Sequence, residues 1–154
     1  MYLLLAGKRA GRIRGEAAAR DHQDEILVRS WAWSVQASSA LGAGHATARR
    51  SYSALTVSKY VDSATTALLS ALATNDEMKE AVLTCRKAGG DHFLYLKIKL
   101  GGARVTQVSH GFAEEGGETL TLTFNRVTLE YRTQLPNGGP GPTSVFEDTL
   151  GPNT

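Results

Sequence analysis

Strict alternation of residue types marks one segment around which the chain can be organised. From residue 27 to residue 35 the side chains alternate between the two faces of an extended strand. One face carries both tryptophans, and it consists of Leu27, Arg29, Trp31, Trp33 and Val35. The other face is small and mildly polar, with Val28, Ser30, Ala32 and Ser34. Because two indole rings bury a large area, the tryptophan face is predicted to point into the core.

The same alternation recurs along the chain and predicts a mainly β protein. Two strand-like segments flank the turn at residues 89–91 and predict a β-hairpin. In the longest segment the phase slips by one residue at Asn125-Arg126, which predicts a β-bulge. The segments with strand character are residues 1–6, 24–35, 51–61, 81–88, 92–100, 103–111 and 118–134.

One helical pattern interrupts the strands. Asp62 or Ser63 can cap its first turn, and the pattern stops near Thr74. The apolar stripe at helical spacing consists of Ala64, Leu68, Leu69, Ala71 and Leu72. About seven strands at hairpin spacing and one helix predict an antiparallel β-barrel or sandwich of two sheets, with the helix packed on its side.

Two segments lack a periodic pattern. Residues 36–50 are rich in Ser, Ala and Gly and are predicted to form a long loop, a candidate arm to another chain. Within it, Gly42-Ala-Gly-His45 lacks the third glycine of a dinucleotide fingerprint. After Leu135 the chain is rich in Pro and Gly. We therefore expect a domain at residues 1–135 and a flexible tail at residues 136–154, with one ordered contact at Val145-Phe146.

Composition narrows the class of protein. The 154 residues suit a single domain, and a net charge of +2 argues against a dedicated nucleic-acid-binding protein. Cys85 is the only cysteine, so no internal disulfide is expected. The apolar run at the start is too short for a signal peptide, and no segment is long enough for a membrane helix. We expect synthesis in the cytoplasm and, if the protein is exported, export without a cleaved leader.

Candidate reaction centres are few. His22, Asp24 and Glu25 could hold a metal, but strand alternation sends the two carboxylates to opposite faces. Cys85 and His92 could act as nucleophile and base, although Cys85 lies in an apolar strand where an inert thiol is expected. Ser109-His110 has no acidic partner close in sequence. No catalytic residue, cofactor or metal ligand is therefore predicted.

Basic residues near the start of the chain leave a second interpretation open. Lys8, Arg9, Arg12 and Arg14 could grip phosphate, or they could belong to a solvated turn with Ile13 dipping into the core. Together with the pair at residues 49–50, they could let a monomeric β-barrel module bind an anionic ligand.

Several stretches match, in order, the motifs of one known family. They are Gly11-Arg-Ile-Arg-Gly-Glu16, His22-Gln-Asp-Glu-Ile26, Ser30-Trp-Ala-Trp-Ser34, Val57-Ser-Lys-Tyr-Val-Asp62, Leu83-Thr-Cys-Arg-Lys-Ala-Gly-Gly90, Tyr95-Leu-Lys-Ile-Lys-Leu100 and Leu120-Thr-Leu-Thr-Phe-Asn-Arg-Val127. This order resembles the Hcp family, the tube protein of bacterial type VI secretion systems. The resemblance covers residues 1–134. It departs at residues 6–14, which are more basic than usual, and at Ala17, where Ser is common.

The resemblance implies a structural role. Six copies would close a ring, and rings would stack into a tube inside a contractile sheath, capped by a VgrG-like spike protein and carrying effectors in its lumen. The protein would wait in the cytoplasm and be secreted without a signal peptide, with no cofactor, nucleic acid or membrane insertion. A tail-tube protein of a phage-like contractile particle would share this fold and remains an alternative.

Two groups of residues become candidate assembly sites under this resemblance. Ser30, Ala32 and Ser34 are candidates for the lumen wall, because a passage must avoid bulky adhesive side chains; they could equally form an ordinary solvent face. Residues 36–50 are the candidate loop between subunits or between rings.

Overall fold

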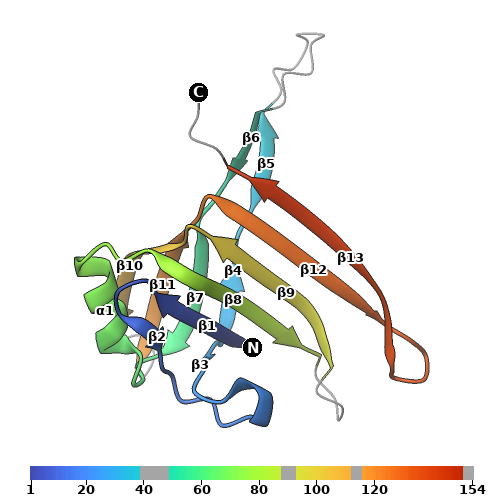
Figure 1. Ribbon diagram of the computed structural model, residues 1–154, viewed down its shortest axis with the longest axis horizontal. Helices are drawn as coiled ribbons and strands as arrows, with labels where there is room; N and C mark the ends of the chain where they lie inside the picture. The colour runs from blue at the N-terminus through green and yellow to red at the C-terminus, as the bar shows by residue number, and fades with distance from the viewer. Residues whose placement is uncertain (39–48, 88–92, 112–115, 151–154) are drawn as a thin grey trace.

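The computed structural model describes residues 1–38, 49–87, 93–111 and 116–150. Two antiparallel β-sheets pack face to face, and helix α1 (Thr65–Ala73) lies at one end of them (Figure 1). The larger sheet contains β1 (Tyr2–Gly7), β2 (Gly11–Ile13), β3 (Ile26–Leu27), β8 (Met78–Arg86), β9 (Leu94–Gly101), β12 (Arg126–Gln134) and β13 (Pro140–Thr149). The smaller sheet contains β4 (Ser30–Ala32), β7 (Leu55–Tyr60), β10 (Arg104–Gly111) and β11 (Gly117–Thr123).

The chain passes from one of the two main sheets to the other after β3, after β7, after β9 and after β11. The larger sheet runs β13-β12-β9-β8-β1-β2, with β3 also paired to β1, and the smaller runs β10-β11-β7-β4. Two further strands, β5 (Val35–Ser38) and β6 (Arg49–Tyr52), pair only with each other among the described residues. The β8–β9 pairing confirms the predicted hairpin, although its turn lies outside the described residues. The predicted class, a mainly antiparallel β fold of two sheets with one helix on its side, is confirmed.

The core lies between the inner faces of the two sheets. Leu3, Leu83 and Ile98 stand side by side across β1, β8 and β9, each about 1% exposed. Val57 and Leu120 face them from β7 and β11 and are fully buried. Each strand supplies alternate residues to this layer because successive side chains point to opposite faces. Full burial of such a side chain contributes about 1.5–3 kcal/mol.

Helix α1 starts after both predicted caps: its N-cap position is Ala64, which makes no side-chain cap hydrogen bond, and Asp62 acts in the turn just before it. The Ala64 N–H donates to Asp62 Oδ1 at 3.0 Å, and the Asp62 N–H donates to Thr65 Oγ1 at 3.0 Å. This reciprocal arrangement satisfies donors that a helix start otherwise leaves free. The helix ends before Asn75, whose φ of 53° lies in the left-handed region that Asn tolerates. No helix in the described part of the chain is long and apolar enough to cross a bilayer.

The tryptophan segment is divided, which corrects the predicted single strand. Leu27 is 49% exposed and Val28 is buried, so the start of the segment faces the opposite way from the prediction. Trp31 and Trp33 do pack against the core, but only partly buried. The phase changes near Arg29, where the chain leaves the larger sheet after β3 and enters the smaller sheet as β4.

The predicted long strand at residues 118–134 is also two strands. β11 belongs to the smaller sheet and β12 to the larger one, so the predicted bulge at Asn125-Arg126 is wrong. The Asn125 N–H donates to Gly101 O at 3.0 Å where the chain crosses over. The slip in phase arises because the two sheets face each other, and the side of the chain that points inward changes on crossing.

The predicted long loop at residues 36–50 is wrong at both ends, where residues 36–38 and 49–50 belong to paired strands. β5 and β6 pair from Val35↔Tyr52 to Ser38↔Arg49, while residues 39–48 lie outside the described residues. The pair projects away from the two sheets (Figure 1). The two ends of the predicted loop therefore form a two-stranded antiparallel ladder.

The predicted flexible tail is wrong for residues 140–149. β13 pairs with β12 from Arg126↔Thr149 to Gln134↔Pro140. Pro140 and Pro142 are tolerated because β13 is the edge strand of its sheet, where a missing N–H breaks no ladder on the open side. The Pro/Gly signal thus marks the turn between β12 and β13, and the chain beyond it returns to strand.

Candidate assembly surfaces

The outer face of the smaller sheet carries small side chains in two rows without a formal charge. The pairing register places these side chains beside one another across all four strands. We call this surface the hydroxyl face; its rows are Ser30–Ser58–Thr119–Ser109 and Ala32–Thr56–Thr121–Gln107. Most of these side chains are half-buried or exposed, whereas their strand neighbours on the other face, such as Val57 and Leu120, form the core.

The predicted lumen residues divide between this face and its border. Ser30 and Ala32 lie in the two rows of the hydroxyl face. Ser34 follows the end of β4, and its N–H donates to Ser53 Oγ at 2.8 Å at the base of the β5–β6 hairpin. The structure therefore groups two of the three residues and places the third next to the projecting hairpin.

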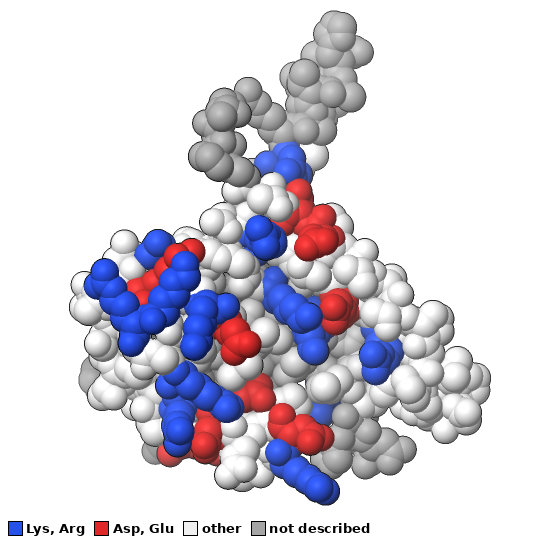
Figure 2. Space-filling model, viewed as in Figure 1, with Lys and Arg blue, Asp and Glu red and all other residues white. Residues whose placement is uncertain are grey.

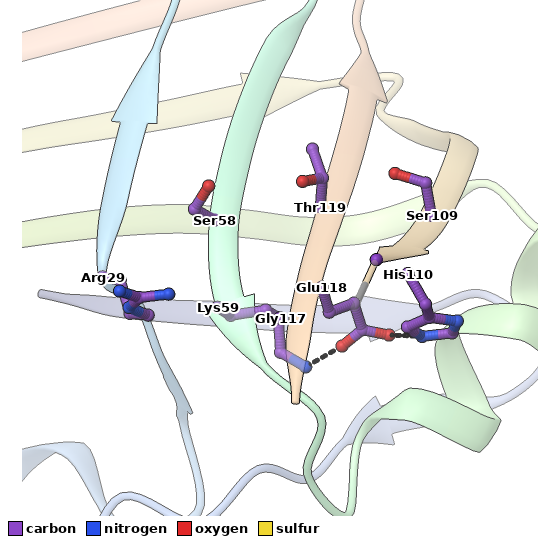
Figure 3. A pocket seen from close by; sticks show the side chains of 9 residues that line it. Arg29, Ser58, Lys59, Ser109, His110, Gly117, Glu118 and Thr119 are labelled. Atoms are coloured by element: carbon purple, nitrogen blue, oxygen red, sulfur yellow. Dashed lines mark hydrogen bonds and ion pairs between the residues drawn. The ribbon is translucent and has the colours of Figure 1, made fainter. Parts of the chain in front are cut away.

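A shallow depression of about 290 Å³ lies at one end of the hydroxyl face (Figure 3). Gly111 and Gly117 are paired across β10 and β11 and leave part of its floor without side chains. A Cβ added at Gly111 would meet no atom within 4 Å. The remaining lining combines the hydroxyls of Ser58, Ser109 and Thr119 with the titratable residues Arg29, Lys59, His110 and Glu118.

Below this depression lies a network of buried charges. The Lys59 Nζ donates to Glu118 Oε2, to Asp62 Oδ1 at 2.8 Å and to Tyr60 O at 2.8 Å. The Thr65 hydroxyl donates to Glu118 Oε2 at 3.1 Å. The Lys59 and Glu118 side chains have no exposed surface, so each charge depends on the other for compensation. The network joins α1 to the smaller sheet.

Sequence reasoning missed this network, although a signal was present. Lys59 shares the inward side of β7 with Leu55 and Val57, and Glu118 shares the inward side of β11 with Leu120. A Lys and a Glu at core positions of two strands are unusual, because such groups are buried only when paired. The partner of Lys59 could not be identified until the strand pairing was known.

His110 has an acidic partner eight residues further along the chain, directly opposite it on β11. Its Nε2 lies 3.1 Å from Glu118 Oε1. Ser109 stands on the other face of β10, with its hydroxyl directed away from the imidazole (Figure 3). A nucleophilic triad needs the serine hydroxyl on the imidazole, so these three residues do not form one.

The other candidate groups can be followed only as far as the structure describes them. His22 Nδ1 lies 2.8 Å from Glu25 Oε2 in a buried pair, while Asp24, whose φ is 63°, has its carboxylate 4.0 Å from Arg14. Within the described ranges, no group of three or more His, Cys, Asp or Glu could hold a metal. Cys85 is buried, and this burial raises the pKa of its thiol. His92 lies outside the described residues.

Three of the four basic residues near the start of the chain have partners of their own. Lys8 pairs with Glu77, the Arg12 Nη2 donates to Gln23 O at 2.7 Å, and Arg14 lies 4.0 Å from Asp24. Ile13 is 2% exposed, as the turn interpretation predicts. Figure 2 shows positive and negative side chains interleaved on this side of the molecule. The arrangement gives the anionic-ligand interpretation little support.

The larger sheet extends past the smaller one at β12 and β13 (Figure 1). Phe146 stands in the same row as Leu129 and Ile98, on the side that elsewhere faces the core, yet it is 47% exposed. Tyr131 lies on the same side and is 41% exposed. We call Tyr131 and Phe146 the overhang. Exposed aromatic side chains of this kind are typical of protein–protein contacts.

Taken together, these features define a class of protein. An antiparallel two-sheet domain with two uncharged rows on one outer face and exposed aromatic side chains is typical of a structural subunit that assembles through its surfaces.

Comparison with known proteins gives the family. The family model for Hcp, the type VI secretion system effector, matches residues 2–131. Protein hcp1 of Pseudomonas aeruginosa is 33% identical over 136 residues, which cover 83% of each chain. The chain therefore belongs to the Hcp family, and the family supports the predicted role of a structural subunit of the type VI secretion tube.

Solved structures agree with this family. A structure described as a type six secretion system protein has a TM-score of 0.83 at 23% identity and covers 97% of this chain and 95% of its own. Hcp1 from Salmonella typhimurium has a TM-score of 0.73 at 28% identity, covering 97% and 94%. The fold of this chain, including β13 beyond the family match, is thus shared across nearly its whole length.

Proposed function

We propose that this chain is a wall segment of the secretion tube, closing with five identical copies into a ring whose channel is lined by the hydroxyl face. The observation that carries this proposal is the pair of uncharged rows across the smaller sheet, which includes the predicted lumen residues Ser30 and Ala32. A channel wall of small hydroxyl side chains offers water-like hydrogen bonds and little apolar area to a passing protein.

The edges of the smaller sheet supply a means of closure. In the described part of the chain, β4 pairs only with β7, and β10 pairs with β11 apart from a single bridge between Arg104 and Glu77. Unpaired sheet edges present free backbone donors and acceptors. If β4 of one copy pairs with β10 of the next, each contact is heterologous and the sheet continues around a closed ring.

The overhang supports the same arrangement. Tyr131 and Phe146 lie on the inner side of the larger sheet, beyond the part that the smaller sheet covers. A neighbouring copy added at the edge of the smaller sheet would cover the inner side of β12 and β13. It would thereby bury the aromatic side chains of Tyr131 and Phe146. Stacked rings, a spike, a sheath and effectors in the channel are the further partners of this proposal, with secretion as its outcome and no catalysis by the chain itself.

The experiment measures particle mass and the position of the hydroxyl face. Light scattering of the purified protein should give six times the chain mass of 16.5 kDa, and electron microscopy should show rings. A gold-cluster maleimide on Ser58→Cys should appear at the ring centre, and on Lys99→Cys, an exposed residue of the larger sheet, at the periphery. The buried Cys85 should not compete for label. A strict monomer, or gold at the periphery for Ser58→Cys, would contradict the proposal.

A further inference from the structure

The β5–β6 hairpin needs contacts at its base to have a fixed direction. It forms a sheet of its own among the described residues and projects from the molecule (Figure 1). An isolated two-stranded hairpin is only marginally stable in water. Its base is closed by Ser53, whose N–H donates to Ser34 O at 2.8 Å. Contacts other than this hydrogen bond must set how the hairpin is oriented relative to the larger and smaller sheets.

One carboxylate of β13 provides such contacts. Arg50 and Tyr52 are two residues apart on β6, so their side chains leave the strand on the same side. Both bind Asp148. The Arg50 Nη2 donates to Asp148 Oδ1 at 2.9 Å and its Nε donates to Oδ2, while the Tyr52 hydroxyl donates to Oδ2 at 2.7 Å. The Arg50 Nη2 also donates to Thr149 O at 3.2 Å.

Aromatic packing joins the same residues to the other elements. The Tyr52 ring is stacked on Trp33, with centroids 5.8 Å apart and planes 15° apart. Phe124 meets both rings edge-on, at 6.0 Å from Tyr52 and 6.5 Å from Trp33. Since Phe124 follows β11 and Asp148 lies in β13, the hairpin base is held by both large sheets at once.

The electrostatics favour the ionised pair. The hydrogen bonds from Arg50 and Tyr52 lower the pKa of Asp148, and the same carboxylate raises the pKa of Arg50. The Asp148 side chain is only 18% exposed. A bidentate Arg–carboxylate pair in this setting fixes orientation as well as distance.

We propose that Asp148 is a positioning residue that directs the β5–β6 hairpin, through Arg50 and Tyr52, toward a second copy of this chain in an adjacent ring. The inference rests on the proposed function. Apart from their pairing with each other, β5 and β6 have no strand partner in the described residues, so their outer edges can accept backbone hydrogen bonds from that copy. A hairpin held in one direction loses less conformational entropy on contact than a loose one.

The test compares Asp148→Asn with Glu147→Gln in the full chain. The first variant keeps the side-chain shape and removes the charge that Arg50 binds. The second makes the same chemical change at the next residue, on the opposite face of β13. We expect Asp148→Asn to keep the ring mass, to raise hydrogen exchange of the Arg49–Tyr52 amides about tenfold, and to weaken ring–ring association in sedimentation about tenfold. Glu147→Gln should match the wild type in all three.

Two further variants separate positioning from general destabilisation. Tyr52→Phe keeps the aromatic stack and removes one donor, so its effect should be smaller and in the same direction. Arg50→Gln combined with Asp148→Asn should add little to either change alone, because the two residues act through each other.

Each remaining outcome overturns a specific statement. Unchanged exchange in Asp148→Asn, or faster exchange with ring association equal to wild type, overturns the positioning role. Wild-type rings that do not associate at any concentration overturn the assignment of the hairpin to a contact between rings. A monomeric wild type contradicts the proposed function itself, before any variant is compared.

Discussion

At the scale of single residues, a cluster of buried charges lies between α1 and the smaller sheet. Lys59 and Glu118 are fully buried, and Asp62 links the same cluster to the turn before α1. A buried pair of this kind contributes little net stability compared with apolar residues, but loss of one partner leaves an uncompensated charge. The cluster therefore fixes how α1 sits on the sheet.

Replacing Lys59 with Met should lower the free energy of unfolding by about 3–5 kcal/mol, because Glu118 and Asp62 lose their shared cation. Urea denaturation measures this loss. Lys99→Met is the matched control, since Lys99 is half exposed and lies 3.6 Å from Glu130; its change should stay below about 1 kcal/mol. Equal losses in the two variants would contradict the structural role of the buried cluster.

Asp76 is a second residue with a local role. Its carboxylate accepts the Ala10 N–H at 3.0 Å and the Arg9 N–H at 3.1 Å, which holds the turn between β1 and β2. These hydrogen bonds, the one from Ala10 first, lower the pKa of Asp76 below its ordinary value. A carboxyl with a lowered folded-state pKa stabilises the fold above its unfolded-state pKa of about 4 and loses that contribution as the pH falls through the folded-state pKa.

Asp76→Asn should therefore be less stable than the wild type at neutral pH, and the difference should shrink as the pH falls from about 5 toward 3. Thermal unfolding at a series of pH values gives both curves. Other carboxylates will lower both melting temperatures in acid. The informative quantity is therefore the difference in melting temperature between the wild type and Asp76→Asn at each pH. A gap that stays constant down to the lowest pH would show that ionised Asp76 does not hold this turn.

At the scale of elements, alternation identified most strands but not the sheets to which they belong. The hairpin at residues 81–100 and the presence of helix α1 were predictable because local patterns determine them. The divisions at Arg29 and Asn125 were not, since a change of sheet and a bulge both shift the phase by one residue. Only long-range pairing distinguishes the two.

Dependence on long-range strand pairing also explains why the tail was predicted wrongly and why only part of the candidate site was found. Pro and Gly near residue 140 suggested flexibility, but pairing with β12 decides the outcome for Pro140–Thr149. Ser30 and Ala32 could be placed on one small face from the sequence, whereas Ser58, Thr119 and Ser109 joined them only through the strand register. Asp148 was missed because its partners lie about a hundred residues away.

Removal of residues 135–154 tests whether β13 is an ordered strand paired with β12. The truncation should expose the edge of β12 and remove the Asp148 contacts to Arg50 and Tyr52. We expect faster hydrogen exchange in both β12 and β6, together with a lower melting temperature. Removal of residues 151–154 alone serves as the control and should change neither. Unaltered exchange in β12 after the longer truncation would contradict the pairing.

At the scale of the whole molecule, the two faces of the β12–β13 region should behave differently. Phe146 lies on the inner side with Leu129, and Val145 lies on the outer side of the same strand. Both are exposed, at 47% and 59%. Under the proposed function, only the inner side meets a neighbouring copy.

Phe146→Asp should shift the purified protein from rings to smaller species, because it puts a charge where two copies meet. Val145→Asp should leave the ring mass unchanged. Both positions are exposed, so each variant should lose less than about 1 kcal/mol of unfolding free energy. Light scattering over a range of concentrations distinguishes the cases, and intact rings in Phe146→Asp would contradict the arrangement of the overhang.

The absence of formal charge in the two rows of the hydroxyl face has a consequence for transport. A channel lined by these side chains would present little electrostatic barrier to either acidic or basic proteins, and changes in salt would hardly alter their passage. Selection would then depend on the diameter of the transported protein and on hydrogen bonds with the serine and threonine side chains. Effectors with opposite isoelectric points could thus use one and the same conduit.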